Sequence, residues 1–194
     1  MRAINLIILA LLAALASSCK GKEIGRCGLT EAEKQLIPYE LKQVVSFIDG
    51  EGQTIELTVI SNETKWNKEK EDGFGDDYVS FEIKSVILRS EPNNLEIKLE
   101  NIYPEVCNSK YYTLYIRIRI NDGWGFTLKS NSEGIFQHTA YSSLEINGKV
   151  YHDVVELKVD ANYPYRQLYY SKTYGILQIN RDGENFLTLN HSNR

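Results

Sequence analysis

The sequence predicts an all-β fold, an antiparallel β-sandwich or flattened barrel of about nine to ten strands with one short N-terminal helix. From Glu40 onward, apolar residues recur with a period of two, which is typical of half-buried strands. Asn147-Gly148 and Asp182-Gly183 favour two-residue hairpin turns, because both central residues of such turns need a positive φ. A single helix start signal precedes these strands.

Residues 6–16 form an unbroken apolar run that follows a basic start at Arg2, as in the core of an export signal. Spanning a bilayer needs roughly 20 apolar residues, so the run is too short for a comfortable transmembrane helix. We therefore interpret the N-terminus as a signal peptide that directs the chain out of the cytoplasm.

Residues 15–19, Leu-Ala-Ser-Ser-Cys, resemble the bacterial lipobox, although the leucine lies four residues before the cysteine rather than the usual three. The resemblance implies that the Cys19 thiol takes a diacylglyceryl group, that the chain is cut before it, and that the new amine is acylated. On this interpretation residues 1–18 are the lipoprotein signal peptide, 19–29 the lipidated N-terminus and tether, and 30–194 a single all-β domain. Two alternatives stay open: ordinary secretion after cleavage at the A-x-A site of residues 14–16, and an uncleaved anchor.

The chain has three cysteines. If Cys19 carries lipid, Cys27 and Cys107 remain as an even pair in a compartment that permits disulfides. A bridge between them would close a loop of about 80 residues and contribute roughly 4 kcal/mol to stability. We expect this disulfide, while two free thiols stay the alternative because spacing alone does not bring two Cα atoms together.

The formal net charge is -4 for the whole chain and more negative once Arg2 is removed with the signal peptide. Nucleic-acid binding asks for a basic face, so no nucleic-acid partner is expected. Tyrosine dominates the aromatic residues, with 13 Tyr against 6 Phe and 2 Trp. The tyrosine ring can be buried while its hydroxyl stays hydrated, which suits half-exposed positions in a sheet. A tyrosine-rich surface that binds a ligand is the less favoured interpretation.

Thr30 and Glu33 match a capping box at the start of the one expected helix. We expect about two turns that carry Leu36 and Ile37 inward and end at Pro38, because the residue before a proline disfavours helical geometry. Residues 20–26, which precede the helix, are expected to be a short polar tether.

The strands are predicted from apolar alternation and from the turns between them. Residues 62–77 are polar, charged and glycine-bearing and are expected to be a long loop, as are residues 134–141 and 160–165. The apolar residues shift parity between Ile83 and Val86, which indicates a β-bulge near Lys84-Ser85. The expected strands cover residues 41–48, 55–60, 79–88, 95–99, 112–120, 124–128, 144–146, 150–159, 169–180 with a bend at Gly175, and 186–189.

Three segments carry a family resemblance: residues 169–177 followed by Arg181-Asp182-Gly183 and Phe186, residues 144–154, and residues 37–39. Together they resemble small uncharacterised lipoproteins of Bacteroidetes-type bacteria, in which a tryptophan usually stands where this chain has Phe186. The resemblance implies a lipoprotein anchored to the outer membrane of a Gram-negative envelope. It implies no catalytic residue.

The sequence shows no arrangement of residues that is typical of a catalytic site. His138 falls in a loop, His152 in a strand and His191 near the end of the chain. His152 and its neighbour Asp153 point to opposite faces of a strand and cannot simply pair. No nucleophile elbow, metalloprotease helix, Cys-x-x-Cys pair or phosphate-binding glycine loop is present. We expect no catalytic residue and no cofactor.

Two groups in or near the predicted loops have functional alternatives. Asp72, Asp76 and Asp77 can bind calcium through carboxylates, but they lack EF-hand spacing, so a solvated loop and no metal site are favoured. Three aromatic residues in or near turns are expected to pack beneath loops rather than to stack on a sugar: Trp66, Phe74 and Trp124.

The predicted function is therefore a non-enzymatic lipoprotein of the bacterial envelope, outside the cytoplasm and anchored to the outer membrane through the lipid on Cys19. The membrane is the one partner that the sequence indicates; a protein or glycan partner and a ligand-binding residue stay unknown. A lipocalin-like carrier of a small apolar ligand is one alternative, and a hydrolase of surface glycans or peptides is the other.

Overall fold

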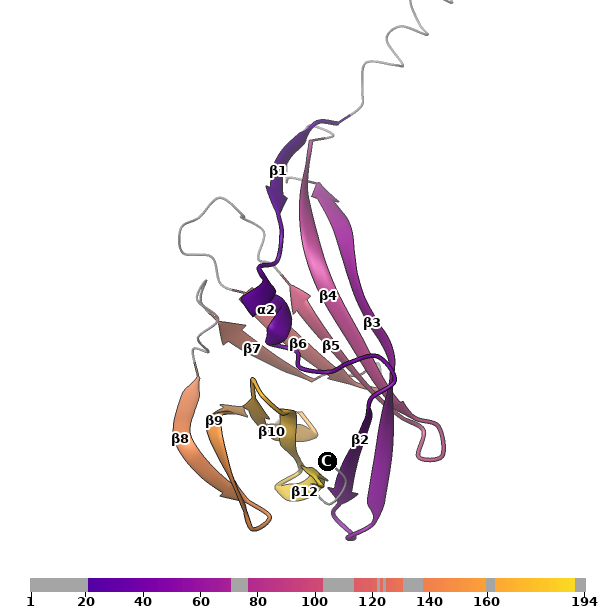
Figure 1. The fold of residues 1–194 in the computed structure, drawn as a ribbon, viewed down its shortest axis with the longest axis vertical. Coiled ribbons are helices and arrows are strands. Elements are labelled where there is room, and N and C mark those ends of the chain that lie inside the picture. Colours follow the sequence, from indigo (N-terminus) through magenta and orange to yellow (C-terminus); the bar gives the residue numbers. More distant parts are fainter. Residues whose placement is uncertain are drawn as a thin grey trace, which may run out of the picture.

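The computed structural model describes residues 21–70, 77–102, 114–121, 123, 125–130, 138–159 and 163–190. Most of this part of the chain lies in one sheet that curls into an open half-barrel, so the all-β prediction is confirmed (Figure 1). Twelve strands are described, rather than nine or ten, with one helix. The elements are β1 (Glu23–Cys27), α2 (Glu31–Gln35), β2 (Val44–Asp49), β3 (Thr54–Lys70), β4 (Tyr78–Ser90), β5 (Leu95–Ile102), β6 (Leu114–Ile120), β7 (Phe126–Ser130), β8 (Thr139–Ile146), β9 (Lys149–Lys158), β10 (Tyr165–Ser171), β11 (Gly175–Arg181) and β12 (Glu184–Leu189).

The sheet is a meander in which an early strand, β2, and the last strand, β12, lie next to each other in the middle of the strand order. Its order is β7-β6-β5-β4-β3-β2-β12-β11-β10-β9-β8, and all of these neighbours are antiparallel. Strand β2 pairs with β12, for example Phe47 with Leu189, which joins the start of the domain to its end. Strands β7 and β8 are the two ends of this order, so the barrel is open between them.

Strict alternation along the strands places the core on the inner side of the curl. In β5 and β6 every second residue is buried, among them Leu99 of β5 and Ile118 of β6, while the residues between them, such as Arg117, face outward. The inward rows of both halves of the sheet belong to one hydrophobic core. This is the geometry that a period of two requires when one face of a sheet is buried.

The sheet has two halves, β2–β7 and β8–β12, which meet at the pairing of β2 with β12. Residues 30–39, which include α2, lie between these halves, and we call them the plug. Leu36, Ile37 and Tyr39 of this plug are at most 2 % exposed. The Thr30 side chain accepts a hydrogen bond from the Glu33 N–H, and the Glu33 carboxylate accepts from the Thr30 N–H, so the predicted capping box is confirmed. The helix has five residues and is shorter than the two turns expected.

Hydrogen bonds tie the plug to both halves of the sheet. The Tyr170 hydroxyl of β10 donates to the Leu36 carbonyl at 2.6 Å, and the Ile176 N–H of β11 donates to the Tyr39 hydroxyl at 2.8 Å. On the opposite side, Lys84 of β4 donates to the Ile37 carbonyl at 2.8 Å. These bonds give the Leu36 and Ile37 carbonyls partners and link the plug to β4, β10 and β11.

The two predicted hairpin turns are present. Asn147 and Gly148 have φ values of 50° and 74°, and Asp182 and Gly183 have 50° and 89°. Strand β4 is continuous through Lys84-Ser85, so the predicted bulge on it is wrong. The register shift lies on its partner β3, between Val59 and Ser61, because the extra residue is accommodated there.

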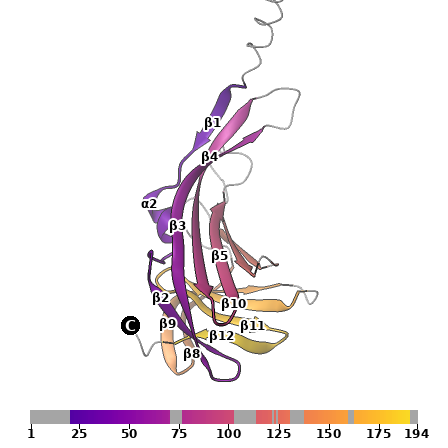
Figure 2. The ribbon, with the colours of Figure 1, turned by 90° about the vertical axis from the view of Figure 1, so that its right-hand side faces the viewer.

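Strands β3 and β4 continue beyond the half-barrel and, with β1, form a three-stranded arm (Figures 1 and 2). We define the arm as β1, residues 65–70 of β3 and residues 78–82 of β4. Strand β1 pairs in parallel with β4, on the side opposite β3. The prediction of a loop is therefore wrong for residues 62–70, as it is for residues 139–141 of β8. The tether expected at residues 20–26 likewise becomes a strand from Glu23.

Candidate functional site

Most residues of the predicted lipid and disulfide sites lie outside the described part of the chain. Cys19 and Cys107 belong to this group, and both stay predictions. Cys27 ends β1 and is 8 % exposed, as a cysteine at the edge of the core would be.

The predicted acidic loop is only partly described. Asp72 and Asp76 lie outside the described residues, and the Asp77 carboxylate accepts a hydrogen bond from the Lys22 N–H at 2.9 Å. Within the described part of the chain, no group of three His, Cys, Asp or Glu side chains is placed to hold a metal ion. Asp77 instead fixes the start of β1 to the start of β4.

Both described histidines contact backbone groups. His138 Nε2 accepts the Lys129 N–H at 2.8 Å; burial, with the nearby Lys129 charge, lowers the pKa of His138 below its usual value of 6.5. His152 Nδ1 lies 3.2 Å from the Ser142 carbonyl oxygen. Among the described residues, neither histidine bonds to a carboxylate, as a general acid–base pair would.

A buried carboxylate, Glu156 of β9, is the centre of a side-chain network that joins β8, β9 and β10. The register brings Tyr169 of β10 directly beside it. The Tyr141 hydroxyl of β8 donates a hydrogen bond to the Glu156 carboxylate at 2.6 Å, and Lys158 Nζ lies 2.9 Å from that carboxylate. The Gln167 side-chain amide of β10 donates a further hydrogen bond to it. Four side chains from three strands therefore converge on one negative charge.

Burial alone would raise the pKa of Glu156, but the hydrogen bonds from Tyr141, Lys158 and Gln167 outweigh it and lower the pKa to about 2. A carboxyl group with such a pKa holds no proton near neutral pH, so it cannot serve as a general acid. Its partners also occupy its oxygen atoms. The network is suited to holding β8, β9 and β10 together rather than to proton transfer.

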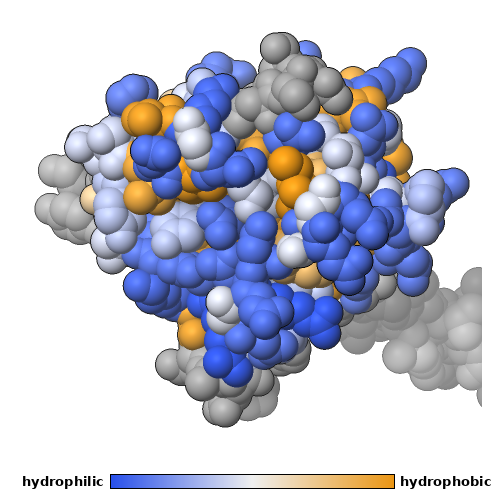
Figure 3. All heavy atoms as spheres, turned by 90° about the horizontal axis from the view of Figure 1, so that it is seen from below, coloured by the Kyte–Doolittle hydropathy of each residue, from blue (hydrophilic) through white to orange (hydrophobic). Residues whose placement is uncertain are grey.

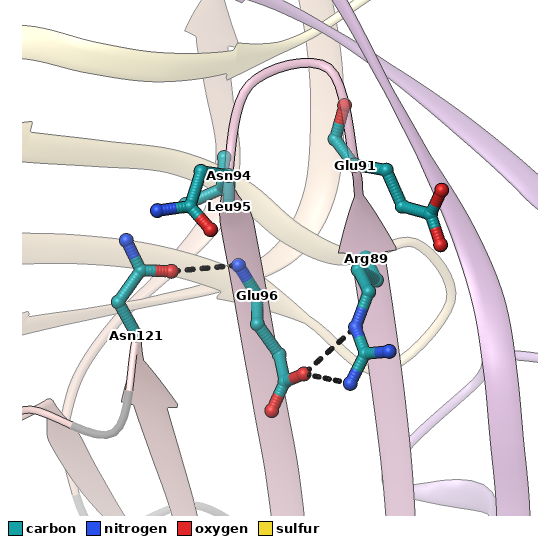
Figure 4. A pocket seen from close by; sticks show the side chains of 7 residues that line it. Arg89, Glu91, Asn94, Leu95, Glu96 and Asn121 are labelled. Carbon is teal, nitrogen blue, oxygen red and sulfur yellow. Dashed lines mark hydrogen bonds and ion pairs between the residues drawn. The ribbon is translucent and has the colours of Figure 1, made fainter.

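The hairpin between β4 and β5 borders an open hollow of about 540 Å³ (Figure 4). Arg89 donates to the Glu96 carboxylate through both Nε, at 2.9 Å, and Nη2, at 2.5 Å. Asn121, at the end of β6, accepts the Glu96 N–H at 2.7 Å through its side-chain oxygen. Arg89 and Glu96 are thus paired with each other, and Glu91, Ser90, Asn94 and Asn121 also line the hollow.

The arm carries a face on which aromatic rings and cations alternate, which we call the aromatic–cationic face. The Arg26 guanidinium carbon lies 4.2 Å from the centroid of the Trp66 ring, and Lys68 Nζ lies 4.3 Å from that of Tyr78. Arg26 and Lys68 flank Ser80 of β4 from either side, so the four side chains share one face. Trp66 is 44 % exposed despite its contact with Arg26.

Comparison with other proteins gives no relative. No protein-family model matches the chain, and neither a curated protein nor a solved structure matches it significantly. Within the described residues, no helix has both the length and the apolar character needed to cross a bilayer.

Sequence reasoning missed the arm because neither of its faces is fully buried there. Residues 63–70 of β3 are exposed on both faces, so the apolar alternation that marks other strands is absent. A usable signal did exist: Thr64 and Trp66 are strand-forming residues, and no glycine or proline interrupts residues 62–70. Glu156 also escaped notice, because only the register between distant strands brings its partners together.

Proposed function

We propose that this chain is a lipoprotein of a bacterial envelope, anchored to the outer membrane through acyl chains on Cys19, with a non-enzymatic β-domain that binds or supports another envelope component. The single observation that carries the proposal is the lipobox-like segment 15–19 directly after an apolar export signal. Several acyl chains hold a protein to a bilayer, since each buried CH₂ contributes about 0.8 kcal/mol.

The position of β1 supports the anchor. Lys22 is already part of the folded arm, because its carbonyl accepts the Tyr78 N–H at 3.0 Å and its N–H bonds to Asp77. Only two residues separate Cys19 from Lys22. A lipid on Cys19 would thus leave almost no free tether, and the folded domain would stand at the membrane surface.

A disulfide between Cys27 and Cys107 is part of the proposal. Cys27 is buried at the end of β1. With Cys19 used for lipid, Cys107 is the one remaining cysteine that can pair with it.

Neither alternative function is favoured by a specific observation. A lipocalin-like carrier needs an apolar cavity inside the barrel, whereas the plug puts Leu36, Ile37 and Tyr39 there. A surface hydrolase needs a nucleophile and base, or two carboxyl groups, that converge in a cleft. The carboxylate with the most perturbed pKa, Glu156, is instead held ionised by side-chain partners.

Membrane fractionation of Cys19→Ser tests the proposal. The wild-type chain should sediment with the outer membrane and resist extraction by salt, whereas Cys19→Ser should lose this association because no lipid can be attached. Cys27→Ser serves as the matched cysteine control and should stay in the membrane fraction. An equal distribution of wild type and Cys19→Ser would contradict the lipid anchor.

A further inference from the structure

We infer that the aromatic–cationic face of the arm lies against the phospholipid surface in which the Cys19 acyl chains sit, so that the arm rests along the membrane. This inference depends on the proposed function, because the lipid on Cys19 is what brings the arm to the bilayer. It adds a second membrane contact, made by Arg26, Trp66, Lys68 and Tyr78.

The length of the tether limits how far the arm can lie from the membrane. An extended chain spans at most about 3.6 Å per residue, so Lys22 lies within about 11 Å of Cys19. A bilayer's headgroup layer is roughly 5–8 Å thick on each side. The tip of the arm, where Lys22 bonds to Asp77 and Tyr78, is therefore held in or beside the headgroups.

The chemistry of the face fits a membrane surface. Trp and Tyr are enriched at the membrane–water interface because their rings are apolar and their N–H or O–H groups stay hydrated. Lys and Arg place their apolar stems beside such rings while their charges reach the phosphates. In the Arg26–Trp66 and Lys68–Tyr78 pairs the charged end itself lies over the ring, so each pair presents an amphipathic ring and a cation together. Ile24, near the tip, adds an exposed apolar side chain.

The cations of the face favour the same orientation, although the arm as a whole is close to neutral. The described residues 22–27, 65–70 and 77–82 hold five basic side chains, Lys22, Arg26, Lys65, Lys68 and Lys70, and four acidic ones, Glu23, Glu69, Asp77 and Glu82. Glu82 lies beside Trp66 on the face, but its carboxylate accepts the Leu29 N–H at 2.9 Å and lies 3.6 Å from Lys34. Arg26 and Lys68 carry the positive charges of the face that can meet anionic headgroups.

The opposite end of the molecule has a different surface. Figure 3 shows this end as mainly hydrophilic, with separate hydrophobic patches. The turns there line a hollow in which four acidic residues outnumber one basic residue: Asp49, Glu51, Asp182 and Glu184 against Arg181. Anionic lipid would repel this end, so the arm is the better membrane contact.

Tryptophan fluorescence of the full-length lipidated protein tests the inference. The chain has two tryptophans, and Trp124→Phe leaves Trp66 as the only one. This variant is placed in vesicles of phosphatidylcholine and phosphatidylglycerol with brominated acyl chains. We expect the bromines to quench Trp66 and iodide in the water to quench it weakly.

A matched control moves the fluorophore to the other end of the sheet. Val150→Trp, in a Trp66→Phe/Trp124→Phe background, places it on β9 at a site that is 53 % exposed in the wild type, and Figure 1 shows β9 far from the arm. It should be quenched by iodide and not by bromine. Replacing Arg26 and Lys68 with Gln should lower the equilibrium constant for contact between Trp66 and lipid about fivefold for each charge removed. Replacing Lys98 and Arg119, on the outer face of β5 and β6, should leave this constant unchanged.

The outcomes separate the inference from the proposed function. If Cys19 carries its acyl mass and Trp66 is quenched by iodide alone, the arm stands in water and the inference is wrong. If Trp66 is shielded from both quenchers, a protein covers the face instead of lipid, which also overturns the inference. A preparation without acyl mass on Cys19 would overturn the proposed function and this inference with it.

Discussion

At the scale of single residues, the charge of Glu156 holds three strands together. Glu156→Gln keeps the shape of the side chain and removes the charge that Tyr141, Lys158 and Gln167 stabilise. Hydrogen bonds to charged groups contribute about 1.5–3 kcal/mol each, so we expect a loss of about 2 kcal/mol in the free energy of unfolding at pH 7, measured by urea denaturation. The exposed Glu145→Gln on β8 is the control and should change stability by less than about 0.5 kcal/mol.

The pKa of Glu156 gives this effect a defined dependence on pH. Its folded pKa, about 2, lies below the usual value of 4.5, so the folded state stabilises the ionised form. The contribution is fully present above pH 4.5 and is lost as the pH falls toward 2. Wild type and Glu156→Gln should therefore converge in stability over this range. A difference that stays constant down to the lowest pH would contradict the account.

At the scale of elements, the plug fixes the curl of the sheet through a few buried hydrogen bonds. Tyr170→Phe removes the donor to the Leu36 carbonyl and leaves that carbonyl buried without its partner, which costs about 1–3 kcal/mol. Thermal unfolding should show a lower Tm for this variant. Tyr115→Phe, on the outer face of β6, is the matched control and should leave the Tm unchanged. Equal Tm values for the two variants would mean that the plug bond does not stabilise the fold.

Elements whose signals are local were predictable from sequence, and those fixed by distant partners were not. Thr30 and Glu33 specify the cap of α2 within four residues, and Asn147-Gly148 specifies its own turn. Strand β1 has no such signal, because Glu23–Cys27 is a strand only through its parallel pairing with β4, more than fifty residues away. The same is true of the candidate sites: Cys19 is marked by its neighbours, whereas the contact of Arg26 with Trp66 exists only once β1 and β3 flank β4.

At the scale of the whole molecule, the two ends of the fold carry different side chains. The arm gathers basic and aromatic side chains beside the proposed anchor, and the half-barrel with its plug extends away from it (Figure 2). Residues from both ends of the strand order and from the plug share one hydrophobic core. If Cys19 carries the proposed lipid, the two residues between it and Lys22 would keep the domain close to the bilayer. We therefore expect the domain to act at the membrane surface rather than at a distance from it.

The intact mass of the protein extracted from membranes tests the central claim most directly. The account predicts a chain that begins at Cys19, carries the added mass of a diacylglyceryl group and an amide-linked acyl chain, and lacks the two hydrogens removed by a Cys27–Cys107 disulfide. A chain that begins elsewhere, or one with an unmodified Cys19 thiol, would contradict the claim that lipid tethers this domain to the envelope.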